Sequence, residues 1–329
     1  MKAVYIKEFG GPENLEFREV SDPPKPEGKQ VLVRVRATGL NRADLLQRKG
    51  FYPPPAGYSP NIPGLEFAGE VVETSAATVD TFKPGDRVMG ITAGEAQAEL
   101  VLIDSSLLFR IPDSLSYAQA AAVPEAFITA HDAVFTQGKL KPNETLLITS
   151  VGSGVGIAAL QVAKAEGIRV IGTSRTAAKI DRCRELGLDV GVLDSKDVRY
   201  ADEVKAATDG HGANVILDLV GGSYFKENLE SLATKGRIIL VGLTGGAVAE
   251  FELRKALQKY ATIIGTLLRP RSTEAKAAAT RAFVEHSMRH IESGKIIPVV
   301  DRVFPAAEAG MAHEYLESNE SFGKVILEF

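Results

Sequence analysis

"SVGSGVGIAALQVAKAEG", residues 150–167, is the stretch that decides the fold. It follows the short apolar run TLLITS (145–150), and its second half has apolar residues at helical spacing. A glycine-rich loop between a strand and a helix lets backbone amides approach a pyrophosphate, and the helix N-terminus adds a partial positive charge. The stretch therefore predicts a dinucleotide-binding loop, although Val151 stands where the usual G-x-G-x-x-G pattern has its first glycine.

The same loop opens a series of alternating strands and helices. Strands that are buried on both faces appear as short, nearly continuous apolar runs, because helices cover both sides of a parallel sheet. Five such runs occur in order: TLLITS (145–150), IRVIGTS (168–174), VGVLD (190–194), ANVILDLVG (213–221) and GRIILVG (236–242). Their order predicts an α/β fold with a doubly wound parallel Rossmann sheet.

Both ends of the chain have a different texture. QVLVRVRATGL (30–40) alternates apolar and polar residues, and turn clusters such as PPKPEGK separate the strands of the first part. The tail, with PVVDRVF and GKVILEF, resembles this first part again. We therefore expect a β-rich domain made of residues 1–125 plus 267–329, with the Rossmann domain, residues 126–266, inserted into it.

Composition limits the class of protein. The 329 residues are 45% apolar and 24% charged, which is typical of a soluble globular protein. The net charge of −4 and the absence of a basic cluster argue against nucleic-acid binding. No apolar run reaches the roughly 20 residues that span a bilayer. The one cysteine, Cys183, cannot form an intrachain disulfide, which fits a reducing compartment. Together, these features predict a cytoplasmic protein that binds neither membrane nor nucleic acid.

The end of the second predicted strand indicates which dinucleotide binds. Proteins of this fold that use NAD have an Asp or Glu there, which binds the ribose. This chain has Ser174 and Arg175 instead, with Lys179 one turn further on. Such groups can donate to a 2′-phosphate and match its charge, so the sequence predicts NADPH. Alternatively, Arg175 and Lys179 are solvated charges at a helix start.

Further cofactor contacts are expected at the carboxyl ends of the strands, which line one edge of a parallel sheet. Residues of the glycine-rich loop should surround the pyrophosphate: Ser153, Gly154, Val155 and Gly156. Residues after the later strands should flank the nicotinamide and its ribose: Gly242, Leu243, Thr244, Leu267 and Leu268. Asp218 either lines this crevice or braces the sheet.

Several motifs occur in order along nearly the whole chain: GGPENLEFREV, GLNRADLLQRKGFYPPP, IPGLEFAGEV, GDRVMG, AAAVPEAFITA, ILDLVGGSYF, GRIILVGLTGG, TLLRPRS and FGKVILEF. With them the chain resembles the zinc-free quinone oxidoreductases of the medium-chain dehydrogenase/reductase superfamily, most of all the tumour-suppressor-inducible NADPH quinone oxidoreductase branch. The resemblance implies that the β-rich part is a GroES-like catalytic domain, and that a quinone binds between the domains. It also implies a homodimer formed through the edge strand near 236–268.

The chain departs from the zinc-dependent members of that superfamily at two positions. Those members have a catalytic Cys in the segment GLNRAD and a His before the Glu of a G-H-E segment; here Asn41 and Leu65 stand there, while Glu66 remains. A zinc site needs a convergent set of thiolate, imidazole or carboxylate ligands. We therefore expect no metal. Without one, hydride transfer to electron-poor acceptors such as quinones or activated enones is the easier chemistry.

Four places carry the remaining predictions. Tyr52 in GFYPPP should orient the substrate and hydrogen-bond its carbonyl oxygen, or else it only packs on the proline-rich loop. Asn41 should hydrogen-bond the nicotinamide or the substrate, or else it caps a helix. The resemblance places Thr129 near the nicotinamide, unless its hydroxyl satisfies a helix carbonyl. It also returns the terminal motif to the cofactor: Phe322, Gly323 and Lys324.

Lys324 and Asp194 need a further remark. Lys324 either neutralises a phosphate or decorates an edge strand. Asp194 stands where the nearest branch has a Tyr, and an acid there suits NADPH less well. The expected function is NADPH-dependent quinone reduction. The alternatives are an NADPH-dependent alkenal or enone reductase and an NADPH-binding protein without catalysis.

Overall fold

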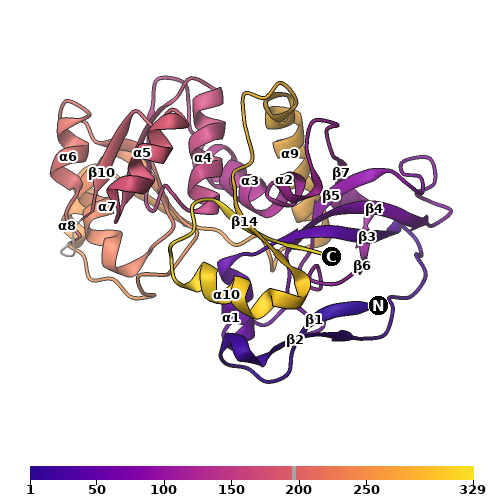
Figure 1. The fold of residues 1–329 in the computed structure, drawn as a ribbon. Coiled ribbons are helices and arrows are strands. Elements are labelled where there is room, and N and C mark those ends of the chain that lie inside the picture. Colours follow the sequence, from indigo (N-terminus) through magenta and orange to yellow (C-terminus); the bar gives the residue numbers. More distant parts are fainter. Residues whose placement is uncertain (195–197) are drawn as a thin grey trace. The chain divides into compact units, whose positions relative to one another are not determined.

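The computed structural model describes residues 1–194 and 198–329, which fold into two compact units. Unit 1 contains Met1–Ile128, Leu268–Glu292 and Pro298–Phe329. Unit 2 contains Thr129–Leu267 and Ser293–Ile297. The chain therefore starts in unit 1, builds most of unit 2 and returns to unit 1, as the colours of Figure 1 show, and it enters unit 2 once more at Ser293–Ile297 before it ends in unit 1.

Unit 2 is built on a parallel sheet of six strands in the order β10-β9-β8-β11-β12-β13. Its strands are β8 (Thr145–Ile148), β9 (Arg169–Ser174), β10 (Val190–Leu193), β11 (Ala213–Asp218), β12 (Leu232–Leu240) and β13 (Thr262–Gly265). Every neighbouring pair is parallel. The predicted doubly wound Rossmann sheet is thus confirmed, and the strand order reverses between β8 and β11, where ligands bind in such folds.

Helices connect the strands of unit 2. They are α4 (Gly154–Ala165), α5 (Ala177–Glu185), α6 (Ala201–Ala206), α7 (Phe225–Ser231) and α8 (Leu253–Lys259), while α3 (Pro124–His131) runs across the first boundary between the units. Fully buried aliphatic side chains from adjacent strands form the core, among them Leu147, Ile171, Ile216 and Ile238. Each contributes about 1.5–3 kcal/mol by leaving water.

Unit 1 is built on a mostly antiparallel sheet, in the order β14-β15-β3-β4-β5-β7, with β6 added on β3. Its strands are β3 (Gln30–Gly39), β4 (Glu66–Thr74), β5 (Arg87–Ile91), β6 (Leu100–Asp104), β7 (Leu108–Arg110), β14 (Val300–Pro305) and β15 (Lys324–Glu328); β1 (Lys2–Ile6) and β2 (Leu15–Glu19) form a separate pair. Its helices are α1 (Arg42–Arg48), α2 (Tyr117–Ala121), α9 (Thr273–Glu292) and α10 (Ala309–Glu317).

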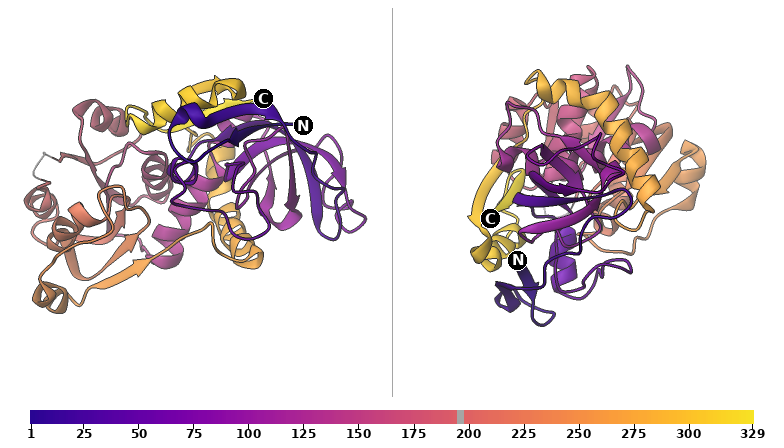
Figure 2. Two further views of the ribbon diagram at one scale, coloured as in Figure 1. Left: turned by 90° about the horizontal axis from the view of Figure 1, so that it is seen from below. Right: turned by 90° about the vertical axis from the view of Figure 1, so that its right-hand side faces the viewer.

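The register of unit 1 brings distant parts of the sequence together. Strand β15 pairs antiparallel with β3, with Ile326 opposite Gly39, so Lys324 at its start lies beside the chain that leaves β3. Both chain ends lie in this unit (Figure 2). None of the helices in the described part of the chain combines the length and apolar character that crossing a bilayer requires.

Candidate active site

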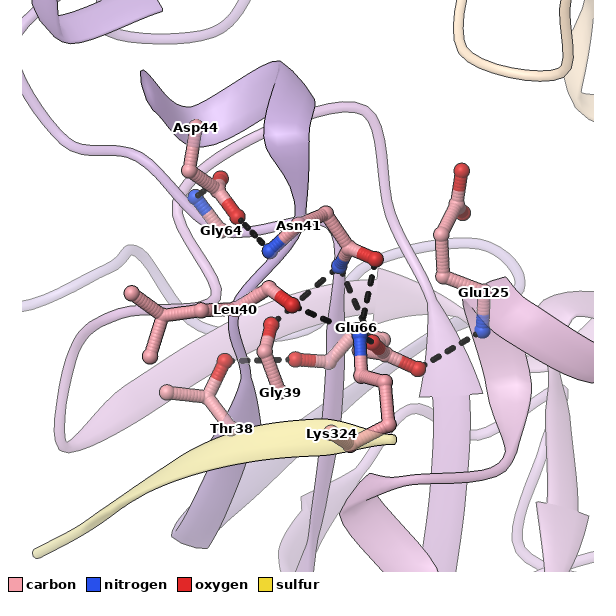
Figure 3. A network of polar contacts seen from close by, with 9 residues as sticks. All are labelled: Thr38, Gly39, Leu40, Asn41, Asp44, Gly64, Glu66, Glu125 and Lys324. Carbon is pink, nitrogen blue, oxygen red and sulfur yellow. Dashed lines mark hydrogen bonds and ion pairs between the residues drawn. The ribbon is translucent and has the colours of Figure 1, made fainter. Parts of the chain in front are cut away.

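A buried ion pair joins β15 to β4. Nζ of Lys324 lies 2.6 Å from Oε1 of Glu66, and the two side chains are 6% and 0% exposed. The same ammonium donates to the carbonyl oxygen of Leu40 and to Oδ1 of Asn41, both at 2.7 Å. Nδ2 of Asn41 donates to Oε1 of Glu66 at 2.9 Å and closes the network (Figure 3). The ammonium of Lys324 thus has three acceptors in the protein itself.

The other oxygen of Glu66 is bound as well. Oε2 accepts a hydrogen bond from the backbone N–H of Glu125 at 2.7 Å. The backbone beneath the carboxylate is glycine for a steric reason, because a Cβ on Gly39 would lie 2.5 Å from Oε1 of Glu66. The side chain of Glu66 is therefore fixed from both sides.

The two positions that bind zinc in the zinc-dependent relatives hold residues whose side chains cannot serve as zinc ligands here. Leu65 is 2% exposed and lies in the core, and the amide of Asn41 is bound to Glu66 and Lys324. In the residues that the structure describes, no group of three or more His, Cys, Asp or Glu side chains could hold a metal ion. These residues do not fit a catalytic zinc.

The one cysteine of the chain is not a reactive group. Burial raises the pKa of the Cys183 thiol to about 12, which leaves it unreactive.

The network bears on the second interpretations of Lys324 and Asn41. Strand β15 pairs with both β14 and β3, so the interpretation that Lys324 decorates an edge strand is wrong. Asn41 does occupy the N-cap position of α1, and its backbone N–H donates to Oδ2 of Asp44 at 2.7 Å. Its side chain nevertheless turns toward Glu66 and Lys324, so Asn41 belongs to the polar network as well as to the helix end.

Arg269 fixes the loop that carries Tyr52. This guanidinium is 4% exposed and donates to the carbonyl oxygens of Ala93, at 2.8 Å, and Tyr52, at 2.9 Å, and to the side chain of Gln47. It also lies over the ring of Tyr52, 5.0 Å from the centroid. Burial raises the pKa of the Tyr52 phenol, while Arg269 opposes that shift. The phenol therefore stays protonated near neutral pH and can donate a hydrogen bond.

Arg269 is not among the residues predicted from the sequence, although it lies in the motif TLLRPRS. The two leucines predicted there precede it, and Leu267 is 55% exposed while Leu268 is 8% exposed. The available signal was a charged residue directly after the last apolar run of the Rossmann part. The side chain of such a residue either extends into solvent or donates to buried acceptors. Which of the two occurs depends on carbonyl groups that are far away in the sequence.

Two further carboxyl groups of unit 1 lie near this network. Burial raises the pKa of Asp44 to about 6, against hydrogen bonds from the backbone of Asn41 and Gly64. Burial also raises the pKa of Glu125 to about 8, with a further increase from the negative charge of Glu66. At pH 7 the carboxyl group of Glu125 stays mostly protonated whereas that of Asp44 is mostly ionised, so Glu125 is the candidate acid. Neither residue is among those predicted from the sequence.

The glycine-rich loop has the geometry of a pyrophosphate site. Ser153 is the N-cap of α4, and its Oγ accepts from the backbone N–H of Gly156 at 3.2 Å. A Cβ on Gly156 would lie 2.6 Å from the carbonyl oxygen of Ser150, so only glycine lets the helix start this close to the loop. Gly154 and Val155 stand partly exposed in the first turn, where free N–H groups attract an anion.

Val151 replaces the first glycine of the usual pattern without loss of fit. Its side chain is fully buried and lies against Gly172 of β9, where a Cβ would come 2.7 Å from the Cβ of Val151. The backbone N–H of Val151 donates to the carbonyl oxygen of Thr173 at 2.9 Å. The space that a glycine normally leaves in the loop is thus provided by the neighbouring strand.

The end of β9 presents positive charge. Ser174 is buried, Arg175 is exposed, and Lys179 is partly exposed on α5. Asp194, after β10, accepts a hydrogen bond from the phenol of Tyr224. The positive charge of Arg175 acts on that phenol too, although burial and Asp194 raise its pKa overall. Oδ2 of Asp194 is therefore engaged within the protein, whereas Oδ1 is buried without a hydrogen-bond partner among the described residues, so an acid at this position still suits a 2′-phosphate less well.

The remaining predicted cofactor residues of unit 2 lie at the same edge of its sheet. Gly242 and Leu243 follow β12, and a Cβ on Gly242 would lie 2.4 Å from the carbonyl oxygen of Leu219. Oγ1 of Thr244 donates to that same carbonyl at 3.4 Å. Asp218 braces this edge, because its Oδ1 accepts from the N–H groups of Val220 and Gly221 at 2.9 Å. Its bracing interpretation thus agrees with the structure.

The other predicted residues lie on helix α3 and in the terminal motif. Thr129 is partly exposed in α3, at the start of unit 2. Phe322 is 3% exposed, and Gly323 has φ +90°, with a would-be Cβ 2.5 Å from the carbonyl oxygen of Val299. Glycine is required there, and it directs Lys324 into the network. Their contacts with a cofactor stay predictions.

The donor set of unit 2 fits an anionic dinucleotide. The N-terminus of α4 is open, Arg175 supplies positive charge, and glycines stand where backbone and ligand must approach.

Comparison with known proteins agrees with this geometry. Residues 27–132 match the family model of an alcohol dehydrogenase GroES-like domain, and residues 154–283 match that of a zinc-binding dehydrogenase. The chain is 31% identical over 332 residues to the quinone oxidoreductase of Rattus norvegicus, covering 99% of this chain and 97% of the relative. It is 34% identical over 317 residues to quinone oxidoreductase-like protein 2 of Mus musculus, covering 95% and 88%.

The fold comparison agrees with the sequence comparison. The structure is similar to that of a quinone oxidoreductase of Escherichia coli solved in complex with NADPH, with a TM-score of 0.89 and 28% identity. The match covers 100% of both chains. The resemblance read from the motifs therefore extends over both units.

Proposed function

This chain belongs to the medium-chain dehydrogenase/reductase superfamily of oxidoreductases, and we propose that it is an NADPH-dependent quinone oxidoreductase that works without zinc. The observation that carries the proposal is the network of Lys324, Glu66 and Asn41. Asn41 stands at one of the two positions that bind zinc in the zinc-dependent relatives, and its amide is bound to Glu66 and Lys324; the other position holds the buried Leu65. Acceptors that are already electron-poor need no Lewis acid. The relatives named quinone oxidoreductase support the same substrate class.

We assign NADPH as the cofactor because of the residues at the binding edge of unit 2. The N-terminus of α4 and Gly156 suit the pyrophosphate, and Arg175 with Lys179 suits a 2′-phosphate. The reduced nicotinamide supplies a hydride when it is bound. The protein contributes position and exclusion of water.

We assign Tyr52 the role of orienting the substrate. Its protonated phenol can donate to the carbonyl oxygen that gains negative charge during hydride transfer. Arg269 binds the carbonyl of Tyr52 and lies over its ring, so the phenol is held before substrate arrives.

The test compares acceptors and cofactors in one assay. Purified protein is mixed with NADPH or NADH and with 1,4-benzoquinone, 9,10-phenanthrenequinone or trans-2-hexenal, and the nicotinamide absorbance is followed. Consumption of NADPH with the quinones supports the proposal. Turnover confined to hexenal would assign the enone reductase instead, and tight NADPH binding without turnover on any acceptor would assign a binding protein.

We also propose that the chain forms a homodimer through β13. This strand is at the edge of its sheet, and large apolar side chains around it are exposed: Leu253, Leu257, Tyr260 and Ile263. An exposed apolar edge strand is a template for pairing with another chain.

A further inference from the structure

Glu125 has a fixed backbone and a free carboxyl group. It lies in the first turn of α3, and its N–H is bound to Oε2 of Glu66 at 2.7 Å. The side chain extends away from the network of Glu66, Asn41 and Lys324 (Figure 3). Among the described residues, its carboxyl group makes no hydrogen bond or ion pair with a side chain of unit 1. Among the described carboxyl groups beside the network, both oxygens of Glu66 and both oxygens of Asp44 accept hydrogen bonds, whereas those of Glu125 do not.

Charged groups from five other segments of unit 1 act on this carboxyl. The negative ones are Glu66 of β4 and Asp44 of α1, and the positive ones are Lys324 of β15, Lys276 of α9 and Arg269. The phenol of Tyr52 is also within electrostatic range of Glu125. Glu125 therefore shares its surroundings with the residue assigned to the substrate.

Lys276, whose charge acts on Glu125, is unusual because it is a buried lysine. It is 5% exposed on α9, and burial lowers the pKa of its ammonium while Glu125 raises it. Among the described residues it forms no ion pair with a carboxylate. A buried lysine without an ion pair is unfavourable for folding, and the carboxyl group whose charge acts on Lys276 is that of Glu125.

We propose that Glu125 is the proton donor of the reaction, and this inference rests on the proposed function. Hydride addition converts the bound quinone into a hydroquinone monoanion. The O–H bond of Glu125 then breaks, a new O–H bond forms on the substrate oxygen, and the neutral hydroquinone results. The carboxylate that is left takes a proton from water before the next cycle.

The other acidic groups of the site are less suited to this step. Both oxygens of Glu66 accept hydrogen bonds, and the ammonium of Lys324 is bound to three acceptors. The phenol of Tyr52 is a weak acid whose pKa is raised further by burial. A donor works best when its pKa lies near the working pH, and the pKa of Glu125, about 8, meets that condition. Tyr52 positions the oxygen and Glu125 protonates it.

The first test is Glu125→Gln, which keeps the backbone contact and the shape but removes the acidic proton. We expect kcat with 1,4-benzoquinone to fall by about 100-fold, in the range found for general acids. The wild-type profile of kcat against pH should fall above an apparent pKa of about 8, and the variant should lose that limb. Glu314→Gln, on the exposed face of α10, is the matched control and should keep the wild-type profile.

The second test is Lys276→Met, which removes the cation that lowers the pKa of Glu125. The alkaline limb should then move to higher pH, a shift that a purely structural role for Lys276 would not produce. This readout also decides the proposal if Glu125→Gln fails to fold.

The outcomes separate the two levels of inference. A wild-type protein that binds NADPH but reduces no quinone overturns the proposed function, and the role of Glu125 with it. An active wild type whose Glu125→Gln variant keeps both its rate and the alkaline limb overturns only the role of Glu125. The same holds if the limb does not move in Lys276→Met.

Discussion

The ammonium of Lys324 neutralises the carboxylate of Glu66 inside unit 1, where the two side chains are 6% and 0% exposed. Removing one partner of such a pair leaves an uncompensated buried charge. We expect Lys324→Met to destabilise the protein by about 3–5 kcal/mol in urea unfolding. The double variant with Glu66→Gln should recover most of that loss, because no charge is left unpaired.

A matched control uses an ion pair of the same kind on the surface. Lys164 and Asp189 lie 2.8 Å apart with exposed fractions of 26% and 35%. Lys164→Met should change the free energy of unfolding by only about 0–1 kcal/mol. Equal losses for Lys164→Met and Lys324→Met would contradict the burial argument.

Arg269→Lys should loosen the loop of Tyr52. A lysine cannot reach the acceptors of Ala93, Tyr52 and Gln47 at once, because it lacks the planar fork of the guanidinium. We expect the KM for quinone to rise about tenfold, equivalent to about 1.4 kcal/mol, with little change in NADPH affinity. Steady-state kinetics with quinone varied at saturating NADPH measures this.

The control for that variant is Arg302→Lys. Arg302 also lies over an aromatic ring, that of Tyr315 at 4.3 Å, but on β14. It should leave the KM for quinone unchanged. A drop in kcat alone for Arg269→Lys would mean that Arg269 acts on the reacting atoms rather than on the loop.

Arg175→Ala tests the choice of cofactor. If this guanidinium binds the 2′-phosphate, the Kd for NADPH should rise about 10-fold to 100-fold, the range of a lost charge-assisted hydrogen bond of about 1.5–3 kcal/mol. The Kd for NADH should stay constant, since NADH has no such phosphate. Arg184→Ala, at the far end of α5, is the control, and fluorescence titration measures both. Equal weakening of both cofactors would show that Arg175 only supports the fold.

Part of this site was predictable because its signals are local. The order strand, glycine loop and helix around Gly156 lies within one stretch, and the apolar runs give the parallel sheet directly. The end of β9 is also local, so Ser174 and Arg175 could be recognised as replacements for an acid. The departure at Val151 was visible, but its compensation by Gly172 was not, because that contact forms between strands.

The polar network could not be predicted in the same way. Glu66, Asn41 and Lys324 are brought together only by the pairing of β15 with β3, across most of the chain length. Nor does sequence show that Lys276 is buried within electrostatic range of Glu125, because a lysine in an amphipathic helix is normally solvated. Burial decides the chemistry of such groups, and burial depends on the complete fold.

Glu125→Gln should stabilise the protein, and more so at higher pH. The folded pKa is about 8, whereas an ordinary glutamate titrates near 4.3, so between these values only the unfolded chain is ionised. Folding stability of the wild type therefore falls as pH rises through this window, and a glutamine removes the dependence. Because Glu125 is partly exposed, we expect a gain of about 1–3 kcal/mol at pH 9 and almost none at pH 4. Urea unfolding across this pH range measures it, and a constant difference would contradict the shift.

Ile263→Lys should dissociate the proposed homodimer. Ile263 is 41% exposed on the edge strand β13, and a lysine there would bury an unpaired charge against the second copy. Light scattering should give the mass of two 35.2 kDa chains for the wild type and of one for the variant. Val303 offers a matched control, because it is also 41% exposed and lies on β14, an edge strand of the seven-stranded sheet of unit 1. If Val303→Lys separates the chains and Ile263→Lys does not, the dimer forms through unit 1, and the apolar side chains around β13 need another explanation.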